Sequence, residues 1–168
     1  TSTGTLIVSD TGTITDLNVQ LSAAHYVNIS NYSFKIISPY GTVVDLVTGT
    51  ANGLAFGNTT FDDEATNTIS SGTAPYFGSF QPAGDLSDID QEEMQGTWTL
   101  WAYNAYSSSS PSNLVSAWSI IVEHDDSTPS DPPTAATEYN GSSFSLTEGT
   151  TSTGTLIVSD TGTITDLN

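Results

Sequence analysis

The sequence has no cysteine and almost no basic residues. Lys35 is the only lysine or arginine among 168 residues, against nineteen acidic residues, and the formal net charge at pH 7 is −18. Phosphate binding needs clusters of lysine and arginine, so nucleic acid is disfavoured as a partner, and so are anionic membrane surfaces. Cations are the partners that this charge favours, and mutual repulsion between acidic surfaces keeps crowded copies soluble.

Long apolar runs and helical periodicity are also missing. No apolar stretch reaches the ~20 residues that a membrane-spanning helix needs, so membrane insertion is not expected. The chain is rich in threonine, serine, glycine and asparagine, and β-branched residues dominate its apolar set. This composition predicts an all-β fold, and we expect a jelly-roll-like β-sandwich.

Alternation of apolar and polar residues predicts the strands. Leu17, Val19 and Leu21 share one face of a half-buried strand over residues 14–21. Residues 32–47 predict a hairpin that turns at Pro39-Tyr40-Gly41. Residues 96–103 carry aromatic residues on both faces, which is typical of a central strand. Further strands are expected at residues 3–9, 58–62, 114–123 and 144–146, and residues 75–90 are expected to form a long packed loop.

The chain contains the same eighteen residues twice. Residues 1–18 and 151–168 both read TSTGTLIVSDTGTITDLN, at a spacing of 150. This period is too long for a solenoid repeat and matches the size of one domain. The chain is therefore either a piece of a tandem array of identical domains or carries a deliberately duplicated segment.

The duplication suggests a division of the chain. We expect residues 1–123 to form a sandwich that lacks its first strand, and residues 124–138 to form an extended, acidic, proline-rich linker. Residues 139–168 are expected to be the opening strands of the next identical repeat. Such strands need a sheet to pair with, either in the next sandwich or at the open edge of a neighbouring copy.

Several motifs, in order over about two-thirds of the chain, resemble the P domain, the β-sandwich that follows the catalytic domain in kexin- and furin-like subtilisin proteases. The matching segments are Ile14-Thr15-Asp16 with Val19, His25 ahead of Ser38-Pro39-Tyr40-Gly41-Thr42, Thr60 to Ala65 (TFDDEA), Phe77 to Pro82 with Leu86-Ser87, Gly96 to Leu100 (GTWTL), and Leu114 to Trp118. The resemblance implies a β-sandwich, and it suggests an accessory domain of a secreted protease. Two departures are Ser30-Asn31-Tyr32 and Asn113, where the family has an acidic motif and a glycine. A repeat every 150 residues also leaves no room for a protease domain.

Acidic clusters are the candidate metal ligands. Hard cations such as Ca²⁺ bind oxygen ligands, which loops often present at alternate positions. Asp88, Asp90 and Glu92 have this spacing, and Asp62 and Asp63 form a second cluster. A solvated acidic surface is the alternative interpretation, because a chain with this many acids has such surfaces in any case.

Four asparagines fit the acceptor pattern for N-glycosylation: Asn28, Asn31, Asn58 and Asn140. Unmodified loop asparagines are the alternative. Trp101, Tyr103 and Tyr106 lie near one another in sequence and are candidates for stacking on sugar rings. Ordinary packing against the second layer is the alternative for these aromatic residues.

No catalytic arrangement is apparent, so we expect no enzyme. His25 and His124 are the only histidines, and neither has a recognisable nucleophile spacing around it. The sequence predicts a non-catalytic structural repeat of an extracellular filament, stalk or giant surface protein, whose partners are neighbouring copies and glycans. A multivalent carbohydrate- or protein-binding module, or an accessory P domain of a secreted subtilisin-like protease, is the alternative.

Overall fold

The computed structural model describes residues 1–24, 32–49, 51–53, 55–105, 113–125, 136–141 and 144–146. His25, Asn28, Asn31 and Tyr106 lie outside these residues, as does the second copy of the duplicated segment. In the described part of the chain, no helix is long and apolar enough to cross a membrane.

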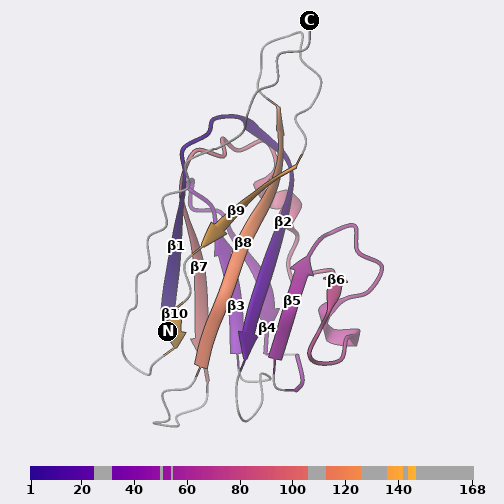
Figure 1. The fold of residues 1–168 in the computed structure, drawn as a ribbon. Helices are drawn as coiled ribbons and strands as arrows, with labels where there is room; N and C mark the ends of the chain where they lie inside the picture. Colours follow the sequence, from indigo (N-terminus) through magenta and orange to yellow (C-terminus); the bar gives the residue numbers. More distant parts are fainter. Residues whose placement is uncertain are drawn as a thin grey trace, which may run out of the picture.

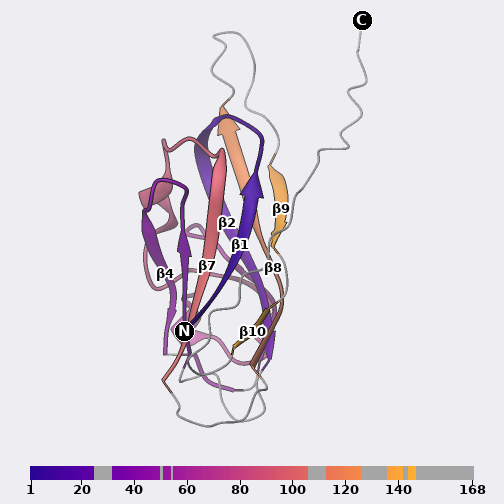
Figure 2. The ribbon, with the colours of Figure 1, turned by 90° about the vertical axis from the view of Figure 1, so that its left-hand side faces the viewer.

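Two β-sheets pack face to face as a sandwich, as the sequence predicts (Figures 1 and 2). The first sheet has the order β1-β7-β3-β4, with β1 at Ser2–Val8, β7 at Gly96–Asn104, β3 at Tyr32–Ile37 and β4 at Val43–Thr48. The second has the order β10-β8-β2-β5-β6, with β9 also pairing with β8. Its strands are β2 (Thr13–Ala24), β5 (Ala55–Phe61), β6 (Gly78–Phe80), β8 (Asn113–Asp125), β9 (Thr137–Gly141) and β10 (Phe144–Leu146).

The core lies between the inward rows of both sheets. Trp98, Leu100 and Ala102 of β7 are fully buried, and Leu17 and Leu21 of β2 face them from the other sheet, as the alternation predicts. The indole Nε1 of Trp98 donates to the carbonyl of Met94 at 3.0 Å, so this large core side chain leaves no polar atom unpaired. The predicted central strand is confirmed, because β7 lies between β1 and β3.

The predicted hairpin over residues 32–47 is also confirmed. β3 pairs antiparallel with β4, and the hydroxyl of Ser38 accepts hydrogen bonds from the backbone N–H groups of Tyr40 and Thr42 at 3.2 Å. Gly41 has φ +90°, a left-handed conformation that glycine adopts without strain. The turn chemistry read from Pro39-Tyr40-Gly41 therefore sets the register of this pair.

Residues 75–90 contain more regular structure than the predicted loop. β6 pairs parallel with β5, and a 3₁₀ turn, η3, spans Leu86–Ile89. A second short 3₁₀ turn, η2, spans Ile69–Ser71. β6 and η2 lie beyond β5 at the outer edge of the second sheet, whereas η3 packs beside β2 (Figure 1).

The C-terminal strands complete the same sandwich. β8 continues through Asp125, so His124 lies in a strand, with 6% of its surface exposed, and not in the linker as predicted. β9 pairs antiparallel with β8 from Thr137 opposite Val122 to Gly141 opposite Trp118, and β10 continues along β8 as far as Asn113. Residues 124–125 and 137–138, at the two ends of the predicted 124–138 linker, are therefore strand.

Candidate functional site

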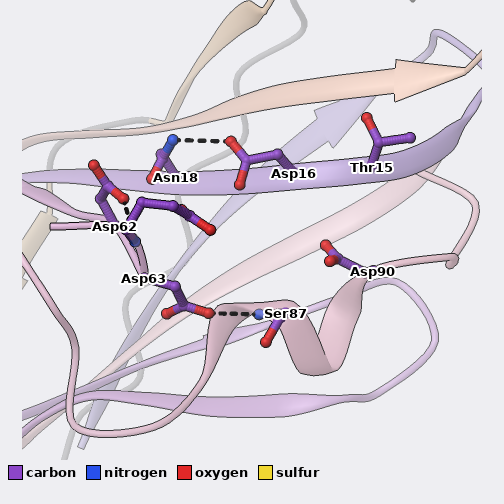
Figure 3. Close-up of a pocket in the computed structure, with 8 residues that line it drawn as sticks. Thr15, Asp16, Asn18, Asp62, Asp63, Ser87 and Asp90 are labelled. Atoms are coloured by element: carbon purple, nitrogen blue, oxygen red, sulfur yellow. Dashed lines mark hydrogen bonds between the residues drawn. The ribbon is translucent and has the colours of Figure 1, made fainter.

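Acidic side chains from three elements surround a hollow of about 380 Å³ on the outside of the second sheet (Figure 3). β2 contributes Asp16 and Asn18, the turn after β5 contributes Asp62, Asp63 and Glu64, and the segment around η3 contributes Ser87 and Asp90, with Thr15 at the margin. The hollow thus unites residues that are far apart in sequence, and its lining is almost entirely oxygen-bearing.

A bulge in β2 brings Asp16 to the hollow. The pairing of β2 with β8 shifts between Ile14 and Asp16, so Thr15 and Asp16 both face outwards between the buried Ile14 and Leu17. The side-chain amide of Asn18 donates to Asp16 Oδ2 at 3.1 Å. The bulge and this hydrogen bond fix the direction of the Asp16 carboxylate (Figure 3).

Asp63 joins two segments of the hollow through hydrogen bonds. Its two carboxylate oxygens accept from the backbone N–H groups of Leu86 at 3.0 Å and Ser87 at 2.9 Å, at the start of η3. Nearby, Asp62 Oδ1 accepts from the backbone N–H of Glu64 at 2.8 Å, which closes the turn after β5. Asp63 therefore attaches this turn to η3, as a capping residue does at a helix N-terminus.

Partial burial and the crowding of carboxylates raise the pKa values of three groups in the hollow, Asp16, Glu64 and Asp90. The pKa of Asp16 is raised by partial burial and by the negative charges of Glu123 and Asp62. Partial burial also raises the pKa of Asp90, together with the charges of Asp16 and Asp63. Each ionised group therefore disfavours ionisation of its neighbours. The described part of the hollow contains no basic residue that would offset this repulsion.

The structure unites part of the predicted metal-ligand set. Asp62, Asp63 and Asp90 line the hollow, whereas Asp88 and Glu92 do not. Glu92 instead accepts a hydrogen bond through Oε1 from the hydroxyl of Thr42. Alternate spacing brings carboxylates together in a suitable loop, but here a 3₁₀ turn with about three residues per turn directs Asp88 away from Asp90.

The sequence reasoning missed Asp16, Asn18 and Glu64. Asp16 and Asn18 alternate with the apolar Leu17 and Val19, which is a usable signal for the polar face of a strand, but their proximity to Asp62 depends on the pairing of β2 with β5. Asn18 Oδ1 and Asp90 Oδ1 are buried atoms without a hydrogen-bond partner. Oxygen donors suit a hard cation, yet no three acidic or histidine side chains in the described residues stand close enough together to hold a metal ion.

Two of the four candidate glycosylation sites lie in the described residues, and both are on the outer face of the second sheet. Asn58 of β5 and Asn140 of β9 are exposed and border a second, smaller hollow over Gln20 and Ser119. Asn58 has φ 55° and its backbone N–H donates to the hydroxyl of Ser22 at 3.0 Å. Both side chains are accessible from solvent, which a glycan requires.

An aromatic pair lies on the outer face of the first sheet. The rings of Trp101 and Tyr103 are nearly parallel, with an interplanar angle of 15° and centroids 5.9 Å apart. The Lys35 ammonium lies 5.5 Å from the Trp101 ring centroid and 3.0 Å from Asp45 Oδ1. Tyr103 is 41% exposed, so this pair faces solvent and does not pack against the second layer.

Comparison with known proteins leaves the family open. No family model and no curated protein matches the chain. A crystal structure of the serine protease of Aeromonas sobria is similar over 85% of this chain and 22% of that one, with 13% identity and a TM-score of 0.39. A crystal structure of the same protease in complex with its chaperone is similar over 83% of this chain and 22% of that one, with 13% identity and a TM-score of 0.39. The chain thus spans about a fifth of the length of these proteins, and similarity at this level does not assign it to their family.

Proposed function

We propose that this chain is part of a tandem array of identical β-sandwiches that acts as a non-catalytic structural repeat of an extracellular filament, stalk or surface protein. The observation that carries the proposal is the identity of residues 1–18 and 151–168. The first copy supplies β1 and the start of β2, and all the other strands of the sandwich, β9 and β10 included, come before the second copy. A period of 150 residues therefore supplies one complete domain.

The surface chemistry supports a spacing role. With −18 charges and a single basic residue, which is already paired with Asp45, neighbouring domains repel one another. Such repulsion keeps the domains of a crowded array from collapsing onto each other. The exposed Asn58 and Asn140 would add glycans to the outer face of the second sheet, with the same effect.

Electron microscopy of native material tests this proposal. An array predicts extended particles whose length grows by a constant increment for each 150-residue period. Mass measurement of the same material would show whether Asn58 and Asn140 carry glycans. Compact particles with a single copy of the sandwich would overturn the proposal.

A multivalent carbohydrate-binding module is the second candidate, and the stacked pair of Trp101 and Tyr103 is the observation that favours it. Parallel, solvent-facing rings offer a flat apolar surface of the kind that sugar rings stack on. Binding of soluble oligosaccharides that is lost in Trp101→Ala and retained in Tyr40→Ala would support this function. Tyr40 is a matched control, because it is an exposed aromatic residue away from the pair.

A further inference from the structure

The strands that follow the sandwich in sequence lie beside the strand that begins it. β1 contacts both β9 and β10, and Figure 2 shows the N-terminus and β10 at the same end of the sandwich. β10 ends at Leu146, and the second copy of the β1 sequence starts only a few residues later, after residues 147–150. The end of β10 thus lies near the start of β1, so a short connection is enough to lead from β10 into β1.

The segment 137–146 fits its position on β8 closely. Gly141 lies opposite Trp118, and a Cβ on Gly141 would come within 1.9 Å of the Trp118 ring, so the indole occupies the space that a side chain would need. Tyr139 is 4% exposed and covers the core between the sheets. Its hydroxyl donates to Asp10 in the turn after β1. The edge of β8 is therefore a specific position for this strand.

In a tandem array, two copies of the segment compete for each such position. One copy follows the sandwich, through residues 126–136, and one precedes it, through residues 147–150. We propose that the preceding copy is the natural occupant, so that the folding unit of the array runs from Thr137 of one period to Asp125 of the next. This inference rests on the proposed array and specifies how its domains are joined.

Connection length and composition favour the preceding copy. The cost of closing a loop rises with its length, so the short 147–150 connection holds its strand at a higher effective concentration than residues 126–136 do. Residues 126–136 also contain Pro129, Pro132 and Pro133, which favour an extended path over a reversal from β8 into β9. Residues 126–136 then separate successive folding units.

Disulfide trapping tests the proposal, because the chain contains no cysteine of its own. The test protein is the full 168-residue chain, preceded by a second copy of residues 137–150. Ile121 and Glu138 are direct cross-strand partners on the outward side of β8 and β9, a geometry that allows a disulfide. Ile121→Cys is combined with Glu138→Cys in either the leading or the trailing copy.

We expect the leading cysteine to crosslink under mild oxidation and the trailing one to remain largely a free thiol. Crosslinking of the trailing cysteine, or equal crosslinking of both, would overturn the proposal. A second measurement uses Gly141→Ala in each copy: the melting temperature should fall by about 4 °C or more for the leading copy and stay unchanged for the trailing copy. Glu138→Gln in either copy is the matched control, because this exposed side chain should leave the melting temperature unchanged.

The crosslinking result does not depend on the native assembly. The test protein contains one sandwich, so it reports which segment completes the sheet even if native material forms no filament. Compact native particles would therefore refute the proposed function while leaving the strand assignment open to its own test.

Discussion

The hydroxyl of Tyr139 donates a hydrogen bond of 2.8 Å to Asp10 Oδ2, across a separation of 129 residues. This bond joins β9, at the edge of the second sheet, to the turn that follows β1 of the first sheet. We expect Tyr139→Phe to lower the free energy of unfolding by about 1.5–3 kcal/mol, as for a hydrogen bond to a charged acceptor. Tyr139→Ala should cost about 3–5 kcal/mol because it also opens a cavity.

Urea unfolding of the full chain measures both effects. Tyr40→Phe is the control, because Tyr40 is 68% exposed and its loss of a hydroxyl should change nothing. Equal stability of Tyr139→Ala and the parent chain would show that β9 does not contribute to the folded sandwich.

Tyr76 anchors the segment after β4 through a pair of hydrogen bonds. Its hydroxyl accepts from the backbone N–H of Asn52 at 2.6 Å and donates to the carbonyl of the same residue at 3.0 Å. Tyr76→Phe keeps the packing of the ring against Phe56 but leaves both backbone groups unpaired. We expect a loss of about 1–3 kcal/mol in urea unfolding. A change below the error of the measurement would mean that water replaces the hydroxyl without cost.

Two aspartates of the hollow should respond to substitution in opposite directions. Asp63→Ala removes the acceptor for two backbone N–H groups at η3, and we expect it to cost about 1–2 kcal/mol, as for loss of a helix cap. Asp16→Asn relieves repulsion, and we expect it to raise the melting temperature at pH 7 by about 1–3 °C. Destabilisation by both would indicate that repulsion in the hollow is negligible.

The advantage of Asp16→Asn should depend on pH in a defined sense. The folded-state pKa of Asp16 is raised, so the proton binds more tightly in the folded than in the unfolded chain. The folded state is therefore favoured below the unfolded pKa of ~3.9, and this stability is lost as the pH rises through the folded pKa. The melting temperatures of the variant and the parent should converge near pH 3.5 and separate towards pH 7. A constant difference across this range would contradict the assigned cause.

Calcium remains a prediction for the hollow. Its oxygen lining suits a hard cation, and binding would require the carboxylates to move closer together than they stand here. We expect the chain to melt several degrees higher in millimolar Ca²⁺ than with a chelator, because a ligand of the folded state alone stabilises it. The gain should disappear in Asp90→Asn and persist in Asp88→Asn, whose side chain lies outside the hollow. Identical melts with Ca²⁺ and with chelator would remove the site.

Local patterns in the sequence predicted the strands well, whereas the site depended on pairings between distant segments. The alternation through Trp98 and Leu100 identifies β7 and its buried face without further knowledge. The hollow needs β2 beside β5, a bulge at Asp16 and the 3₁₀ turn at Leu86–Ile89, none of which short-range periodicity specifies. The pairing of β9 with β8 likewise depends on which sheet edge is left free by the other strands, and short-range periodicity does not specify this.

Thr137 opposite Val122 also determines how the sandwich responds to force. The proposed folding unit begins at Thr137 and ends at Asp125, which lie at the same end of the molecule, so its two attachment points are neighbours. Tension between them peels β9 from β8 one residue pair at a time and does not shear all pairs at once. Peeling needs little force for each step, so an array of such units would lengthen gradually under load and absorb shocks by releasing and re-forming single strands.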